Sequence, residues 1–297
     1  MTDIASSDVP SGVHLTDPLS VPDQPPADLM YRHSSNLLPS VRELWARREM
    51  IFTLAERDIR ASYKQAFLGI AWALITPLAQ LIIFTFVFTR ALKFSTGGVP
   101  APVYLYAGIL SWNFFSNSLG AGGNSMLTNM PLLQKTHFPR ACFPLSQLAE
   151  AAVYTAIAVV PMGLLMAVYG YAPRAEIIWV PFLLLVEIAF TAGVVLAFSA
   201  LVIHVRDLVQ VLGLLTQLGL LATPVIWPYS KIPHSFQPLY GVLNPLGPVI
   251  NNIRRTMLLG LSPDWPVLAA GVFGALCYLV GGYVVFKRLE VSFADIA

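Results

Sequence analysis

Uncharged polar side chains recur at helical spacing inside two otherwise apolar stretches of the chain. Amides and hydroxyls are costly in hydrocarbon unless they face a partner or water. They could zip two helices together, or they could line a conduit whose hydrogen-bonding wall suits a hydroxyl-rich substrate better than an ion. The candidate channel-lining residues are Trp72, Thr76 and Gln80 in one stretch and Gln210, Gln217 and Thr223 in the other.

Glu187 is the one acid placed deep in an apolar stretch. An ionised carboxylate at such a position costs about 2.5–3.5 kcal/mol on insertion scales, so we expect it to be protonated or paired. Two roles are open. It could make a structural hydrogen bond, which the lack of an obvious partner favours, or it could couple transport to protons.

Residue patterns for other chemistries are missing from the sequence. No G-x-x-x-x-G-K-[ST] phosphate loop occurs, so the chain cannot hydrolyse ATP in the P-loop manner. The five histidines fall at no ligand spacing, and no catalytic triad or carboxylate pair stands out. Gly120, Gly122 and Gly123 resemble a glycine-rich loop, but they lie inside an apolar stretch, which favours close helix packing. We expect no catalytic residue, metal or cofactor.

The composition indicates that the apolar stretches, with the polar residues inside them, are membrane-spanning segments. Of 297 residues, 56% are apolar and 11% are charged, which is typical of a membrane protein. The first apolar stretch runs for about 21 residues, or roughly 31 Å of helix, enough to cross a bilayer. The six predicted spans are residues 68–88, 103–124, 145–169, 177–203, 209–227 and 265–286.

The segments around these spans complete an all-α architecture. Residues 38–66 predict an amphipathic helix lying on the inner membrane surface, with Ser40 and Glu43 at capping-box spacing. Residues 1–37 are polar and rich in Pro, Ser and Asp, which is typical of a disordered cytoplasmic tail. Residues 236–246 and 249–261 are apolar but too short to span, so we expect short re-entrant or interfacial helices before the last span. Residues 67–297 then form one permease domain.

Loop charges predict the orientation. With the N-terminus inside, twelve of the 18 Lys and Arg residues fall in cytoplasmic segments, as the positive-inside rule requires. Both termini should therefore be cytoplasmic.

Aromatic residues gather near the predicted span ends. Tyr104, Tyr106, Trp227 and Tyr229 fit a belt at the headgroup level. They could instead stack on sugar rings, an alternative that also involves Trp112, although the belt is favoured.

Several motifs in order resemble ABC-type polysaccharide-export permeases, the transmembrane subunits of O-antigen, teichoic-acid or galactan exporters. The resemblance covers about residues 38–297. The motifs are RDIRASYK at 57–64, LGIAW at 68–72, TP at 76–77, KTHFPR at 135–140, PLS at 144–146, RDL at 206–208, TPVI at 223–226, NP at 244–245 and FAD at 293–295.

The resemblance implies a homodimer of this chain bound to two copies of a separate ABC ATPase, which would bind the ATP. Its cargo would be a polyprenyl-pyrophosphate-linked glycan, such as a cell-wall galactan, moved from the cytoplasm to the outer face of the plasma membrane. Arg60 and Lys64 would meet the headgroup, and the charge sign fits a phosphate independently. No nucleic-acid partner is expected. The ATPase-coupling residues by this resemblance are Asn129, Leu132, Lys135, Phe138, Pro139 and Arg140.

Two other functions remain open at this point. An ABC-type drug or lipid exporter would share the same architecture, because the scaffold does not fix the cargo. A proton-coupled secondary transporter would use Glu187, although no internal repeat supports it.

Overall fold

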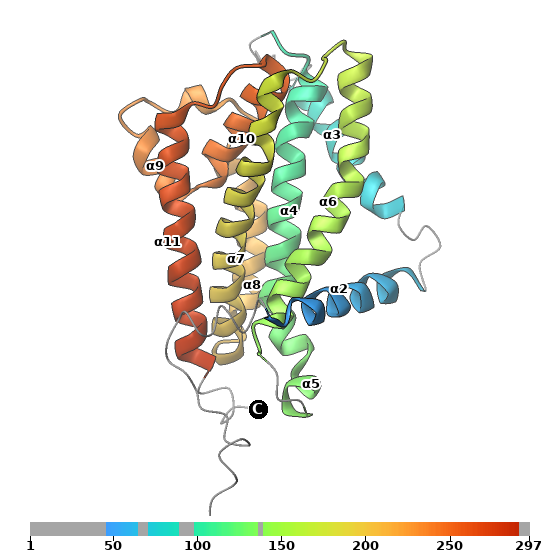
Figure 1. Ribbon diagram of the computed structural model, residues 1–297, viewed down its shortest axis with the longest axis vertical. Coiled ribbons are helices and arrows are strands. Elements are labelled where there is room, and N and C mark those ends of the chain that lie inside the picture. Colours follow the sequence, from blue (N-terminus) through green and yellow to red (C-terminus); the bar gives the residue numbers. More distant parts are fainter. Residues whose placement is uncertain (1–45, 65–70, 89–97, 136–138, 291–297) are drawn as a thin grey trace, which may run out of the picture. The chain divides into compact units, whose positions relative to one another are not determined.

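Helices account for nearly all of the chain that the computed structural model describes, which comprises residues 46–64, 71–88, 98–135 and 139–290 (Figure 1). Within these ranges no strand occurs, and all of them belong to the unit Leu37–Ala297. The predicted tail, Ser40, Phe138 and the 293–295 motif lie outside the described residues. The α-helices are α2 (Arg48–Tyr63), α3 (Trp72–Phe86), α4 (Ala101–Thr128), α5 (Met130–Lys135), α6 (Cys142–Val168), α7 (Val180–His204), α8 (Leu208–Ala222), α9 (Gln237–Leu243), α10 (Leu246–Arg254) and α11 (Trp265–Glu290).

Among the described residues, three helical segments are long and apolar enough to cross a membrane: α6, α11, and α7 together with the short 3₁₀ helix Ala175–Trp179 that precedes it. The chain is therefore suited to several passes through a bilayer. Helices α3 and α8 are apolar but 15 residues long, or roughly 22 Å, short of a hydrocarbon core of about 30 Å. Six spans thus remain a prediction.

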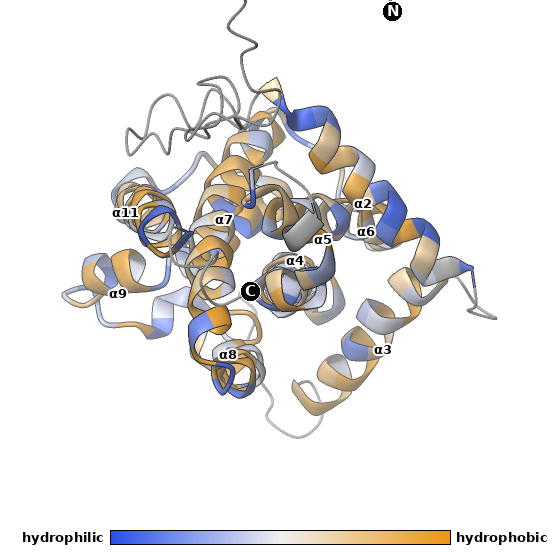
Figure 2. Ribbon diagram, turned by 90° about the horizontal axis from the view of Figure 1, so that it is seen from below, coloured by the Kyte–Doolittle hydropathy of each residue, from blue (hydrophilic) through white to orange (hydrophobic). Residues whose placement is uncertain are grey.

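Helix α4 is the central helix. It packs against α3, α6, α7, α8 and α10, and Figure 2 shows it between α3, α6, α7 and α8. Its 28 residues are long enough to span, but it carries too many polar side chains to count among the apolar segments. Tyr106, Leu119 and Met126 on this helix are fully buried. A helix with such mixed composition is stable in a membrane only when other helices shield its polar face.

Close backbone contact joins α7 to α11. A Cβ on Gly282 would overlap the backbone of Gly193, and a Cβ on Gly193 would overlap the backbone of Tyr278. Small residues allow this approach, which stabilises helix pairs in membranes through dispersion contacts.

The glycines of α4 confirm the helix-packing interpretation at two of three positions. Gly122 faces Val195 of α7, and Gly123 faces Leu212 of α8. Gly120 has no atom within 4 Å of its Cβ position, so it does not serve close packing.

Helix α2 runs roughly crosswise to the long helices beside the lower part of α6 in Figure 1, and it shows both hydrophilic and hydrophobic residues in Figure 2. It packs on α6 through a face that includes the buried Ala55 and the half-buried Ile59. Phe52, predicted on the same apolar face, is 64% exposed. The described part of this helix therefore has a packed side and an exposed side, and Phe52 is left largely uncovered by the described residues. Its place on the membrane surface stays a prediction.

The short helices before the last span are present as α9 and α10, followed by a π-helical turn, Arg255–Leu259. Helix α8 ends at Ala222, five residues before the predicted limit, where Thr223 and Pro224 leave the helical conformation. Asn244, between α9 and α10, donates from Nδ2 to Thr223 Oγ1 at 2.9 Å. This contact ties the bend of the α9–α10 pair to the end of α8.

Arg254 of α10 also contacts the segment that follows α8. It is 4% exposed and donates to the carbonyls of Tyr104 (3.0 Å), Pro224 (2.8 Å) and Val225. Its guanidinium also lies 3.8 Å from the centre of the Tyr104 ring. Among the described residues no carboxylate forms an ion pair with it. Backbone carbonyls freed by the end of α8 thus satisfy a buried cation.

Candidate functional site: a polar cavity

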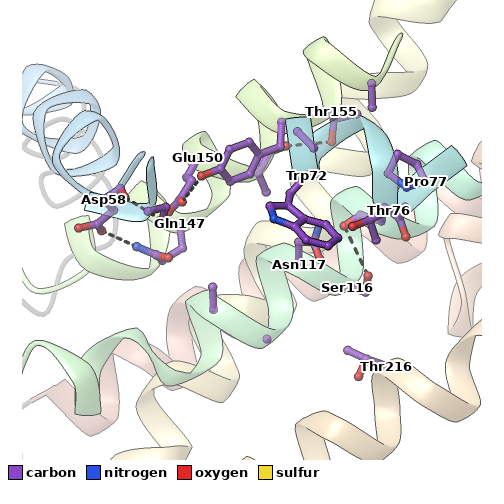
Figure 3. Close-up of a pocket in the computed structure, with 18 of the residues that line it drawn as sticks. Asp58, Trp72, Thr76, Pro77, Ser116, Asn117, Gln147, Glu150, Thr155 and Thr216 are labelled. Carbon is purple, nitrogen blue, oxygen red and sulfur yellow. Dashed lines mark hydrogen bonds between the residues drawn. The ribbon is translucent and has the colours of Figure 1, made fainter. Parts of the chain in front are cut away.

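A cavity of about 970 Å³ lies between α2, α3, α4, α6 and α8 (Figure 3). Hydroxyl and amide side chains dominate its polar lining, and Trp72, Trp112 and Tyr154 add aromatic surface. A volume near 1,000 Å³ is at the upper end for sites that hold small molecules. The cavity can therefore accommodate a solute with many hydrogen-bonding groups.

Helix α4 supplies one wall through a stripe of small and polar residues. Asn113, Ser116, Asn117, Gly120 and Asn124 recur at steps of one, three or four residues and all line the cavity. This spacing puts them on one helix face. The stripe lies within the predicted second span and was not recognised from the sequence, where the aromatic residues of the same span took precedence.

A hydrogen bond bridges two walls of the cavity. Asn113 Nδ2 on α4 donates to Gln80 Oε1 on α3 at 2.9 Å. The pair satisfies part of each amide, and both residues still line the cavity. The bond therefore links α3 to α4 beside the cavity and favours one register of the two helices.

Formal charges in the described lining are confined to the end where α2 crosses. They are Arg57 and Asp58 of α2 and Glu150 of α6. Arg57 and Asp58 form an ion pair at 2.7 Å. Asp58 also accepts from Gln147 Nε2 at 2.7 Å, and Glu150 accepts from Tyr154 at 2.9 Å. The rest of the described lining is uncharged.

The predicted channel-lining residues divide into two groups. Trp72, Thr76, Gln80 and Gln217 line the cavity. Gln210 is exposed outside it. Thr223 is buried, also outside the lining, where it accepts the hydrogen bond from Asn244 described above. Helix α8 ends just before Thr223, so the last turn of the predicted polar stripe does not exist.

The predicted headgroup residues lie on α2 but outside the cavity lining. Arg60 is exposed and pairs with Glu56 one turn earlier on the helix, and Lys64 is exposed at the helix end. Arg57, one turn before Arg60, is the cation that reaches the cavity. Arg60 was assigned from the family resemblance and its charge, and Arg57 lies in the same RDIRASYK motif with the same charge, so the sequence contained the signal.

The predicted coupling residues sit on and around α5. Asn129 caps α4, lines the cavity and bonds to Arg57. Leu132 packs against a buried apolar cluster at this end, and Lys135 ends α5. Pro139 is buried, and Arg140 donates from Nη1 to the Glu290 carbonyl at 2.9 Å.

Two aromatic residues assigned to a headgroup belt are inside the protein. Tyr106 is fully buried and donates to the Ala158 carbonyl at 2.9 Å. Tyr229 is 3% exposed and donates to the Gln237 carbonyl at 3.1 Å. The belt interpretation is wrong for these two, because each hydroxyl meets a backbone acceptor that the sequence could not reveal.

Comparison with known proteins assigns this chain to a family. A family model described as ABC-2 type transporter matches residues 49–258, well over half of the chain, and the chain belongs to that family. It is a transporter membrane subunit, and membership implies that it works with an ABC ATPase.

Individual relatives are similar along nearly their whole length. The chain is 26% identical over 256 residues to the O-antigen export system permease protein RfbA of Myxococcus xanthus, covering 86% of this chain and 98% of that protein. It is 26% identical over 249 residues to the protein of the same name in Klebsiella pneumoniae, covering 84% and 95%. The predicted resemblance to polysaccharide-export permeases is confirmed.

Proposed function

We propose that this chain is the permease subunit of an exporter that moves a lipid-linked polysaccharide from the cytoplasm to the outer face of the plasma membrane. Two copies would act with two copies of an ABC ATPase, and both termini of each copy would be cytoplasmic. The relatives named for O-antigen export support the class of cargo. The observation that carries the proposal is the uncharged polar wall of the cavity.

This wall suits a glycan for a physical reason. Sugar hydroxyls both donate and accept, and Asn113, Asn117 and Gln217 offer both functions at the cavity surface. Many weak, similar bonds allow a polymer to slide, since no single position holds it tightly. Trp72 and Trp112 add flat apolar faces of the kind that stack on sugar rings. An ion would instead require charges or rings of carbonyls along the path.

The flanks of the cavity support a dimer. Helix α3 packs on α4 and α6, whereas α8 packs on α4 and α7, so these two walls stand on different sides of α4. Their outer surfaces are apolar and exposed: Ile82, Ile83, Leu218 and Leu221 are 57–69% exposed. A polar cavity cannot be left open to hydrocarbon. A second copy packed against α3 and α8 would seal it and enclose a continuous path.

The charged end of the cavity would receive the lipid-linked headgroup. Arg57 in the cavity, with Arg60 and Lys64 on the exposed face of α2, would attract a pyrophosphate at the inner membrane surface. Helix α5 with Pro139 and Arg140 would dock on the ATPase, and α9 and α10 would form the outer gate.

The proposal is tested in cells depleted of this chain. We expect the lipid-linked glycan to accumulate on the cytoplasmic side, and the ATPase to copurify with the chain from membranes. Accumulation of a drug or a simple lipid instead would favour the alternative ABC exporter. Uphill transport by the purified chain without any ATPase would overturn the proposal.

A further inference from the structure

A second cavity, of about 400 Å³, lies between α4, α6 and α7 beside the end of α10. Its lining is mostly apolar, with Leu184 and Ile188 on α7, Met162 on α6 and Met257 after α10. This volume falls within the range of small-molecule sites. The cavity is thus large enough for a ligand and different in chemistry from the polar one.

Glu187 is the one ionisable side chain in the described lining, which also contains the hydroxyls of Ser111 and Thr155. It is 1% exposed, and neither carboxyl oxygen meets hydrogen-bond geometry with a donor among the described residues. Ser111 of α4, in the same lining, is the hydroxyl group that approaches the carboxyl. Thr155 in the same lining already donates to the Ala151 carbonyl at 2.8 Å. Buried polar atoms are nearly always satisfied, and leaving one unmet costs free energy. The structural hydrogen bond expected from the sequence has a candidate donor in Ser111, but one hydroxyl proton can satisfy only one of the two carboxyl oxygens. At least one oxygen is therefore left for a ligand to meet.

The cavity reaches the surface between α6 and α7. Val159, Leu184 and Ile188 line it and are 38–48% exposed. Both helices belong to the segments that are long and apolar enough to cross a membrane. Their exposed apolar surface faces hydrocarbon, so a molecule that enters the cavity comes from the lipid phase.

We propose that this cavity binds an apolar membrane molecule that carries one hydroxyl group. The apolar chain would lie between α6 and α7, and the hydroxyl would hydrogen-bond to Glu187. A hydroxyl is favoured over an amine because a charged group at this depth is costly. The two cavities share Leu110 and Thr155 in their linings, but Glu187 belongs only to the apolar one, so the proposal does not depend on the identity of the exported cargo.

The test uses two photoreactive probes on the purified full-length chain in lipid nanodiscs. One is 1-hexadecanol with a diazirine in its chain, and the other is hexadecane with the same diazirine. We expect the alcohol to label α6 and α7 peptides around the cavity about fivefold more than the hydrocarbon, the ratio of roughly one net hydrogen bond. Unlabelled 1-hexadecanol should compete. In Glu187→Leu the ratio should fall to about one, and in Glu187→Gln it should persist.

A pair of variants on α6 controls for general lipid contact. Ala156 lines the cavity at an exposed position, so Ala156→Phe should block labelling by the alcohol. Val160 is 71% exposed and outside the lining, so Val160→Phe should leave labelling unchanged. If Glu187→Leu fails to fold, the comparison of Ala156→Phe with Val160→Phe still tests the proposal. Equal labelling by both probes in the wild-type chain, or alcohol labelling spread evenly over the exposed helices, would overturn the proposal.

Discussion

Arg57 of α2 donates from Nη2 to the side-chain oxygen of Asn129 at 3.1 Å, and Asn129 is the residue that caps α4. Asn129 Nδ2 in turn donates to the Ser125 carbonyl at 2.9 Å. The Asn129 side chain therefore joins α2 to the start of the segment proposed to contact the ATPase. Arg57 itself lines the polar cavity. A displacement of α5 would be passed directly to the charged end of the cavity.

Breaking this contact should loosen the coupling between ATP hydrolysis and export. We predict that Asn129→Leu lowers the amount of glycan exported per ATP hydrolysed by about two- to fivefold, because the bond is partly exposed and worth about 1 kcal/mol or less. Export and ATPase turnover are measured on the same reconstituted complex. Thr53→Ala, an exposed change on α2 that affects only a bond to Glu49 within the helix, is the matched control. An unchanged ratio in Asn129→Leu would show that the contact does not transmit motion.

Arg140 gives a second test of the coupling region. It holds the start of α6 to the last turn of α11 through the Glu290 carbonyl, beside the ion pair between Lys287 and Glu290 at 2.7 Å. We predict that Arg140→Glu uncouples ATP hydrolysis from export without preventing membrane insertion, whereas Arg140→Lys retains most of the coupling. The readouts are membrane abundance, ATPase turnover and export. Normal export by Arg140→Glu would remove the docking hypothesis.

The polar cavity predicts a steric block at Gly120. No atom lies within 4 Å of its Cβ position, and the residue lines the cavity. Gly120→Phe should therefore fold normally, narrow the path and reduce export at least about tenfold. Gly163→Phe is the matched control: Gly163 also has open space, but it lies on α6 outside the lining. Export is measured as glycan reaching the outer surface. Full export by Gly120→Phe would mean that the cargo passes elsewhere.

Neighbouring glycines on α11 provide a stability test. Gly282→Ala forces a methyl group into the Gly193 backbone and should destabilise the helix pair by about 1–3 kcal/mol. Gly281→Ala meets open space and should be neutral or slightly stabilising, since alanine favours helix by about 1 kcal/mol. Thermal unfolding in detergent compares the two. Equal melting temperatures would contradict the close packing described here.

Helical periodicity and apolar length predicted most of the elements, because both depend on local sequence. Helices α4, α6 and α11 begin and end within four residues of the predicted spans. The partners of individual polar groups were not predictable. Thr223 was predicted to line a channel, and no role was predicted for Arg254, yet both residues hold the end of α8 against the α9–α10 pair.

Part of the cavity lining could be predicted, because it forms a periodic stripe along one helix. Trp72, Thr76 and Gln80 form a stripe on one helix, and the stripe points into the cavity. Gln147 and Glu150 are single polar residues on α6, and only the packing of α2 against that helix gives them a common site with Asp58. Tertiary contacts of this kind leave no periodic trace in a sequence.

Arg254 binds carbonyls from the start of α4 and from the turn that follows α8, while belonging to α10 itself. The side chain of Arg254 thus connects three segments. If one of them moved outward alone, the buried cation would lose hydrogen bonds without gaining water. To widen this end, the three segments must move together with Arg254, or water must first replace the carbonyls as hydrogen-bond partners of Arg254. If α9 and α10 form the proposed outer gate, its opening would be opposed by the hydrogen bonds of this buried cation as well as by the packing of the helices.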